Sequence, residues 1–262
     1  MKTLGTIKGL LLDLDGVLYV GANVIEGAID AVNKIRESGI SCRFITNTST
    51  LSLASLEQKI NVLGFSISAN EIISAPQAAL LYLKNQSAPV CRLLLADDVK
   101  KDFIDFPQSD SKANYIVIGD IGKAWSYPLF NEVFSCLMQG AKLIAIHKNR
   151  FWQTEEGLQM DIGGFIEGLE YASSSKALII GKPSANFYQI ALDDMRLKPE
   201  EVAIIGDDID VDVGGGQQVG LMGILVKTGK YRQLYTDSSS IKPDLILDSI
   251  KDLPELLLQQ SL

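Results

Sequence analysis

The sequence is poor in residues that several enzyme classes require. Its 262 residues include one histidine, His147, and three widely spaced cysteines. Two-histidine phosphatase chemistry and histidine-rich zinc sites need more than one imidazole, and no Gly-x-Ser-x-Gly segment is present to form the nucleophile elbow of a serine hydrolase. Three cysteines without a Cys-x-x-Cys pair indicate reduced thiols rather than a disulfide framework. We therefore expect a cytoplasmic protein.

Long apolar runs and blocks of basic residues are also absent. The apolar run Gly9–Leu12 near the N-terminus is interrupted by Asp13 and Asp15, and no other segment approaches the roughly 18 uninterrupted apolar residues of a membrane-spanning helix. The formal net charge is −8. A partner with a phosphate backbone or an anionic surface requires a basic patch, so we expect neither nucleic acid nor membrane as a partner.

What the sequence does contain is a regular alternation of apolar runs and segments of helical periodicity. This alternation predicts an α/β fold with a doubly wound, mainly parallel, Rossmann-like core sheet. Hydrophobic residues make up 47 % of the chain, which is enough for a sizeable core. The core strands are expected at Leu10–Leu12, Ile40–Ile45, Ala177–Ile180, Val202–Ile205, Leu221–Val226 and Asp244–Leu247.

The middle of the chain has its own α/β pattern. Candidate linkers at Lys84–Pro89 and Ser173–Ser175 bracket it, and it contains apolar runs at Cys91–Leu95, Tyr115–Ile118 and Lys142–Ile146. We therefore predict a Rossmann-like core in two parts, residues 1–87 and 176–262, with a smaller α/β domain inserted at residues 88–175.

Four of the expected core strands are followed by groups that a phosphoryl-transfer site needs. Open α/β sheets bind ligands at the carboxyl ends of their strands. A lysine binds phosphate as a point charge, short polar groups can donate to phosphate oxygens, and acidic clusters suit a hard cation such as Mg²⁺. Each segment alone has a structural alternative, such as an acidic turn, a helix cap or a solvated charge. In chain order they are Asp13-Leu14-Asp15-Gly16, Thr46-Asn47-Thr48, Gly181-Lys182-Pro183 and Gly206-Asp207-Asp208, with Asp212 close behind.

These four segments, in this order, resemble the four motifs of the haloacid dehalogenase superfamily of phosphohydrolases. The insertion between the second and third segments is similar to the large α/β cap class of that family. The stretches Gly206–Arg232 and Ala145–Lys148 resemble the branch that contains phospholysine phosphohistidine inorganic pyrophosphate phosphatase and its uncharacterised relatives. One departure is Val211, where many capped relatives carry threonine.

The resemblance implies a Mg²⁺-dependent phosphatase that acts on small phosphorylated compounds. Asp13 would attack phosphorus and form an aspartyl-phosphate, and Asp15 would act as general acid and base. The phosphate would be held by Thr46, Asn47 and Lys182. Mg²⁺ would be held by Asp13, the backbone carbonyl of Asp15 and Asp207, with Asp208 and Asp212 orienting these ligands or Lys182.

The substrate and one alternative function stay open at this point. The loop after Ile146 offers four candidate cap contacts to the substrate: His147, Lys148, Asn149 and Arg150. For the histidine, a structural role at a strand end is favoured over a substrate contact. Hydrolysis of pyrophosphate or a phosphoamidate is compatible with the resemblance, as is a homodimer. The alternative to an enzyme is a non-catalytic phospho-acceptor or phosphate-binding regulatory module on the same acidic Mg²⁺ site.

Overall fold

The computed structural model describes residues 3–154 and 157–259, which pack into two compact units. We call the first the core unit; it contains the described parts of residues 1–46, 57–73 and 182–262. The second, the inserted unit, contains the described parts of residues 47–56 and 74–181. The division between the two units therefore falls near residues 73 and 181. The predicted domain boundaries fall near residues 87 and 175 and stay a prediction. No helix in the described ranges is long and apolar enough to cross a membrane.

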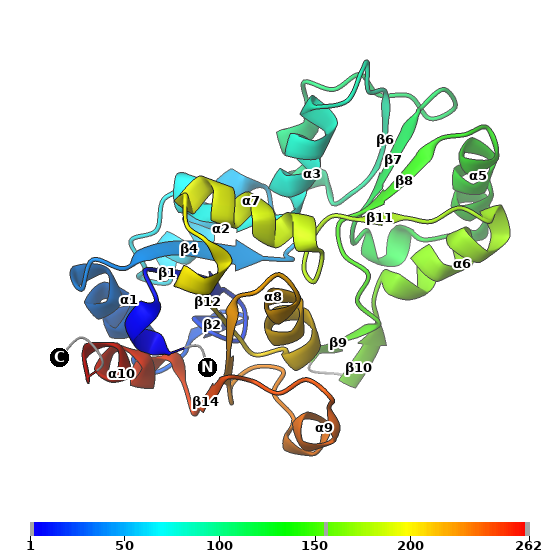
Figure 1. The fold of residues 1–262 in the computed structure, drawn as a ribbon. Helices are drawn as coiled ribbons and strands as arrows, with labels where there is room; N and C mark the ends of the chain where they lie inside the picture. Colours follow the sequence, from blue (N-terminus) through cyan, green and yellow to red (C-terminus); the bar gives the residue numbers. More distant parts are fainter. Residues whose placement is uncertain (1–2, 155–156, 260–262) are drawn as a thin grey trace. The chain divides into compact units, whose positions relative to one another are not determined.

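A six-stranded sheet with the strand order β14-β13-β12-β1-β4-β5 forms the centre of the core unit (Figure 1). β1 pairs in parallel with both β12 and β4, and the pairs β12–β13 and β13–β14 are parallel as well. This order is that of a doubly wound Rossmann-like sheet, which confirms the predicted α/β fold. The strands are β1 (Gly9–Asp13), β4 (Ser41–Thr46), β5 (Ile72–Ser74), β12 (Val202–Gly206), β13 (Met222–Val226) and β14 (Leu245–Leu247).

The apolar patterns explain how this sheet and its helices pack. All five residues of β1, β12 and β13 are buried, as expected for parallel strands that are covered on both faces. Helix α1 (Ala28–Glu37) buries the four positions at helical spacing, Ala28, Ala31, Val32 and Ile35. The other helices are α2 (Leu53–Val62), which runs from the inserted unit into the core unit, α7 (Ala185–Met195), α8 (Gly215–Gln218), α9 (Gln233–Ser238) and α10 (Leu253–Gln259).

Two short irregular features follow the central strands. After β1, the chain forms an antiparallel hairpin of β2 (Tyr19–Val20) and β3 (Asn23–Val24), with Gly21 at a φ of 62° in the connecting turn. After β12, residues Ile209–Gly214 form a π-helical turn that leads directly into α8. This turn is wound more widely than an α-helix.

The inserted unit has a separate four-stranded sheet in the order β11-β8-β7-β6, and all three pairs are parallel. Its strands are β6 (Cys91–Leu94), β7 (Tyr115–Ile118), β8 (Lys142–Ala145) and β11 (Leu178–Ile179), and a two-stranded antiparallel ribbon is formed by β9 (Phe151–Thr154) and β10 (Gly157–Met160). Its helices are α3 (Ala75–Lys84), α4 (Asp97–Lys100), α5 (Tyr127–Met138) and α6 (Gly163–Ser173).

This sheet corrects one strand assignment. The apolar run Ala177–Ile180 was predicted as a core strand, but Leu178 pairs with Ile144 and Ile179 with Ala145, so the run completes the sheet of the inserted unit. The periodicity of a short apolar run does not reveal which sheet will accept its backbone hydrogen bonds. The chain enters the core unit only after this strand, at Lys182.

Candidate active site

Three strand ends of the core sheet bring polar side chains to one edge. Asp13 is the last residue of β1, Thr46 is the last residue of β4, and Asp207 follows β12 directly. Because β12, β1 and β4 are adjacent and parallel, their carboxyl ends meet at the same edge of the sheet. All three side chains are buried. The structure therefore clusters residues that lie far apart in the sequence, as predicted.

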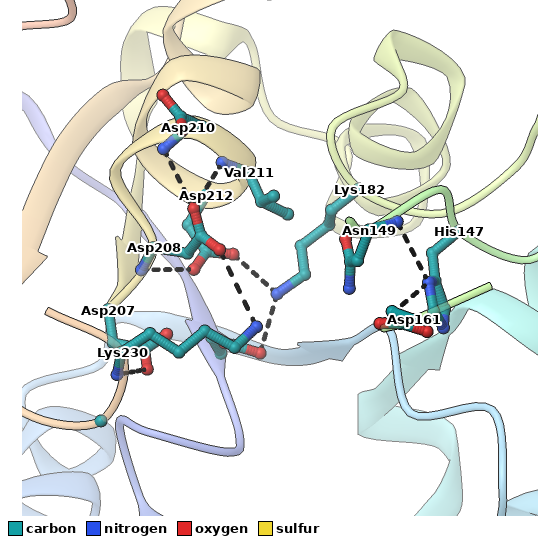
Figure 2. A network of polar contacts seen from close by, with 12 residues as sticks. His147, Asn149, Asp161, Lys182, Asp207, Asp208, Asp210, Val211, Asp212 and Lys230 are labelled. Carbon is teal, nitrogen blue, oxygen red and sulfur yellow. Dashed lines mark hydrogen bonds and ion pairs between the residues drawn. The ribbon is translucent and has the colours of Figure 1, made fainter. Parts of the chain in front are cut away.

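Lys182 forms the centre of this cluster (Figure 2). Its Nζ lies 2.8 Å from Asp13 Oδ1 and 2.7 Å from Asp212 Oδ1, and its side chain is 3 % exposed. Burial alone would lower the pKa of the Lys182 ammonium, but the two carboxylates outweigh burial and raise it. The lysine thus carries a fixed positive charge beside Asp13, whose Oδ1 also accepts a hydrogen bond of 2.8 Å from the backbone N–H of Leu14.

Asp207 has an unusual environment for a buried carboxylate. Its Oδ2 accepts a 2.6 Å hydrogen bond from the backbone N–H of Lys230, but its Oδ1 has no hydrogen-bond partner among the described residues. Burial, together with the nearby carboxylates of Asp13 and Asp212, raises its pKa well above the ordinary value. A buried carboxylate oxygen without a partner destabilises the protein unless it contacts a cation or accepts a hydrogen bond.

The three buried carboxylates of Asp13, Asp207 and Asp212 could share a metal ion. Each offers one oxygen, and these oxygens lie within 4.8 Å of one another. Hard oxygen ligands are those that Mg²⁺ prefers. The orphaned oxygen of Asp207 provides a position for such an ion, so the residues present fit a divalent cation.

The π-helical turn after β12 holds the remaining acidic residues in place. Asp208 Oδ1 accepts hydrogen bonds from the backbone N–H groups of Asp210 (3.1 Å) and Val211 (3.0 Å), and Asp212 Oδ2 accepts one from the N–H of Asp208 (3.2 Å). Burial raises the pKa of the Asp212 carboxyl to about 7, although the Lys182 ammonium acts in the opposite direction. Asp208 and Asp212 are thus engaged by protein groups, whereas Asp207 keeps an unused oxygen.

A loop after β13 also contributes to the cluster, and the sequence analysis missed its role. Thr228 Oγ1 donates a hydrogen bond to the carbonyl of Gly16, and Lys230 Nζ lies 3.8 Å from Asp208 Oδ2. Between them, Gly229 has a φ of 56°, and a Cβ added there would lie 2.0 Å from an oxygen of Asp207. The signal in the sequence was Thr228-Gly229-Lys230 after an apolar strand, which resembles the other strand-end segments.

Asp15 lies in the tight turn that joins β1 to the hairpin. The N–H of Gly16 donates to the carbonyl of Tyr19 over 2.7 Å, and Asp15 forms an isolated β-bridge with Tyr19. The Asp15 side chain is exposed, but the surrounding protein desolvates its carboxyl and raises its pKa, against the opposing charges of Lys59, Lys230 and Lys182. A carboxyl whose pKa is raised keeps its proton to a higher pH than a free aspartate does, and an exposed one can exchange that proton with a bound molecule.

The remaining predicted contacts belong to the inserted unit. Asn47 packs against Gly181, where an added Cβ would lie 2.4 Å from Asn47 Oδ1. His147 is buried, with Nε2 3.4 Å from Ser49 Oγ and Nδ1 3.9 Å from Asp161 Oδ2. These contacts give His147 structural partners.

The other three residues of the same loop also have partners in the inserted unit. The N–H of Asn149 lies 3.5 Å from His147 Nδ1, as Figure 2 also shows. Lys148 forms ion pairs with Glu167 and Glu170 over 2.7 and 3.0 Å, and Arg150 lies 5.9 Å from the centroid of the Phe151 ring. Their predicted roles as substrate contacts, and that of Asn47 as a phosphate ligand, stay predictions.

Fold and site together define an α/β protein with a buried lysine and a buried carboxylate cluster at the carboxyl edge of a parallel sheet. Family models agree with this class: the model for haloacid dehalogenase-like hydrolases matches residues 10–105, and a HAD-hydrolase-like model matches residues 179–253. Phospholysine phosphohistidine inorganic pyrophosphate phosphatase from Xenopus laevis is 38 % identical over 96 % of this chain and 95 % of its own length. Haloacid dehalogenase-like hydrolase domain-containing protein 2 from Homo sapiens is 37 % identical over the full length of both chains. The chain therefore belongs to the haloacid dehalogenase family of hydrolases, in the branch that the sequence resembled.

Solved structures agree on the fold. The p-nitrophenyl phosphatase from Archaeoglobus fulgidus has a TM-score of 0.89 at 26 % identity and covers 95 % of this chain and 98 % of its own. The 4-nitrophenylphosphatase from Thermotoga maritima reaches the same TM-score at 23 % identity, with 96 % and 98 % coverage. Both matches extend over nearly the whole length, so the fold includes the inserted unit as well as the core.

Proposed function

We propose that this chain is a Mg²⁺-dependent phosphatase that hydrolyses small phosphorylated compounds through an aspartyl-phosphate on Asp13. The observation that carries the proposal is the pairing of Asp13 with Lys182 beside the orphaned oxygen of Asp207. A carboxylate nucleophile needs positive charge nearby to reduce repulsion, because the phosphate it approaches is itself an anion. Membership of a hydrolase family favours this reading over a non-catalytic phospho-acceptor module.

The cation would be held by Asp13, Asp207 and the backbone carbonyl of Asp15. Asp212 is less suited to direct binding, because its two oxygens already accept from Lys182 and from the N–H of Asp208. Bound Mg²⁺ would shield the negative charges of the nucleophile and the phosphate from one another. Asp208 and Asp212 would then orient Lys182 and the loop around Asp207.

The protein groups would act in two steps. Asp13 forms a bond to phosphorus while the bond to the leaving oxygen breaks, and Asp15 gives its proton to that oxygen. Water then attacks phosphorus, Asp15 takes a proton from the water, and the carboxylate of Asp13 is released with inorganic phosphate. Lys182 stabilises the charge that builds up on the phosphoryl oxygens in both steps, and Thr46 and Asn47 would hold these oxygens.

The names of relatives suggest which compounds to test. Phosphoamidates and pyrophosphate appear in the name of the Xenopus laevis relative, and a nitrophenyl ester in that of the Archaeoglobus fulgidus enzyme. We propose compounds of these classes as substrates. The cytoplasmic location and the homodimer expected from the sequence also stay proposals.

The decisive experiment compares wild type with Asp13→Asn. The variant should lose activity on p-nitrophenyl phosphate by more than about a thousandfold, because the nucleophile is removed while the residue size is kept. Acid-quenched wild type incubated with labelled substrate should carry a phosphoryl group that the variant lacks. Asp30→Asn, at an exposed acid of α1, is the matched control and should keep full activity. Substantial turnover by Asp13→Asn, or full wild-type activity in EDTA with no metal detected, would overturn the proposal.

A further inference from the structure

A lysine outside the four sequence segments lies on the aromatic ring next to the proposed general acid. Lys59 is a half-buried residue of α2, and its Nζ lies 4.4 Å from the centroid of the Tyr19 ring. Tyr19 is fully buried, and its backbone is tied to the turn of Asp15 by the β-bridge and by the hydrogen bond from Gly16. The ring therefore supports the ammonium of Lys59 close to Asp15.

The charge of Lys59 differs from the other positive charges around Asp15 in lacking an acidic partner. Lys182 is paired with two carboxylates, and Lys230 lies 3.8 Å from Asp208. For Lys59, no carboxylate oxygen lies within 4.0 Å anywhere in residues 3–154 and 157–259. An ammonium without an acidic partner in the described ranges therefore lies over the ring of the residue that pairs with Asp15, the proposed general acid.

We propose that Lys59 determines specificity by binding a negatively charged group on the leaving part of the substrate. This inference rests on the proposed function, because it is Asp15 as the acid that places the leaving group near Lys59. The chemistry that fits is a phosphate ester or anhydride whose leaving group carries a carboxylate or a second phosphate. A neutral leaving group would leave the ammonium without an ionic partner.

The hydroxyl of Tyr19 adds a second observation at the same place. It is buried and has no hydrogen-bond partner in the described part of the chain, and burial, with the nearby carboxylates of Asp15 and Asp13, raises its pKa. The ring, rather than the hydroxyl, contacts the ammonium. Replacing Tyr19 by phenylalanine therefore removes the hydroxyl and keeps the ring that contacts Lys59.

The test compares the ratio of kcat/KM for charged and uncharged leaving groups. Wild type, Lys59→Gln and Lys59→Arg are assayed with pyrophosphate, 2-phosphoglycolate and p-nitrophenyl phosphate. Lys59→Gln should lower the ratio of each charged substrate to the nitrophenyl ester by about tenfold or more, which corresponds to about 1.4 kcal/mol. Lys59→Arg should restore most of the ratio. A fall with pyrophosphate alone identifies a second phosphate as the bound group, and a fall with phosphoglycolate alone identifies a carboxylate.

Variants of Tyr19 and an unrelated lysine complete the design. Tyr19→Phe keeps the ring and should keep the ratio, whereas Tyr19→Leu removes the support of Lys59 and should lower it. Lys34→Gln, at an exposed lysine of α1, controls for the loss of a general positive charge and should not move the ratio. Equal losses on charged and uncharged substrates in Lys59→Gln, or an unchanged ratio, would overturn the proposal.

A binding measurement separates this proposal from the proposed function. Methylenediphosphonate and methylphosphonate cannot be hydrolysed and differ by one charged group, so their dissociation constants can be compared by calorimetry in Mg²⁺ buffer. If wild type hydrolyses none of the three substrates, the proposed function fails. The role of Lys59 then stands only if Lys59→Gln weakens the diphosphonate about tenfold more than the monophosphonate, and falls if both weaken equally.

Discussion

Asp207→Asn should stabilise the metal-free protein while abolishing its response to Mg²⁺. Asp207 is 2 % exposed, and one of its carboxylate oxygens has no partner in the described structure. An unsatisfied buried polar group costs about 1–3 kcal/mol, and a charged one costs more. Asparagine keeps an oxygen to accept from the N–H of Lys230, removes the charge, and offers an amide N–H₂ to the carboxylates of Asp13 and Asp212.

The expected magnitude follows from these groups. A gain of about 1–3 kcal/mol in a protein of this size corresponds to a rise in Tm of roughly 2–10 °C in EDTA. In the wild type, Mg²⁺ at about a hundred times its Kd should add about 2.7 kcal/mol of stability, because it binds only the folded state. Asp207→Asn should show little of this gain. The stability advantage of Asp207→Asn over the wild type in EDTA should therefore shrink by about 2.7 kcal/mol in saturating Mg²⁺.

Differential scanning calorimetry in EDTA and in millimolar Mg²⁺ measures both effects. Asp210→Asn is the matched control, since Asp210 lies in the same acidic turn but is exposed. It should change stability by less than about 0.5 kcal/mol and keep the Mg²⁺ response. The reasoning is refuted if Asp207→Asn is less stable than wild type in EDTA, or if Mg²⁺ raises its Tm as much as that of the wild type.

Two further substitutions test the other groups of the cluster. Lys182→Met should destabilise the protein by about 3–5 kcal/mol in thermal unfolding, because it leaves Asp13 and Asp212 as buried carboxylates without a counter-ion; a loss below about 1 kcal/mol would mean that the ion pairs contribute little. Asp15→Asn should slow turnover by about 10²–10⁴-fold in steady-state assays, because no group remains to transfer the proton, while the rise in Tm with Mg²⁺ persists. A matching loss of the Mg²⁺ response would instead make the Asp15 side chain a metal ligand.

The central strands and their polar ends could be predicted from the sequence. The apolar runs before Asp13 and Asp207 are short, continuous and fully buried, and the strand before Thr46 ends in the buried pair Phe44 and Ile45. In a parallel sheet such runs must end at one edge, so the meeting of these three residues follows from the strand pattern without coordinates. The strand pattern did not predict that Lys182 forms an ion pair with Asp13.

Lys182 lies beside Asp13 and Asp212, but the argument that led to it was partly wrong. The strand before it was assigned to the core sheet, but Leu178 and Ile179 complete the sheet of the inserted unit. Strand pairing depends on which neighbouring backbone is free to accept hydrogen bonds, and a local apolar pattern carries no information about that neighbour. The lysine was singled out because it follows an apolar strand, although that strand belongs to the other sheet, and the resemblance to a known family then implied its role.

The sequence by itself determined which strands form and which polar groups follow them, because apolar periodicity and strand ends are local properties of the chain. Only the tertiary structure decided which of these groups pair and which stay unpaired. It paired Asp212 with Lys182, left an oxygen of Asp207 without a partner among the residues that the structure describes, and placed the Lys59 ammonium over the ring of Tyr19. These outcomes depend on packing between residues that are distant in the chain. The free energy of a buried charge depends on whether such neighbours provide a counter-charge or hydrogen bonds.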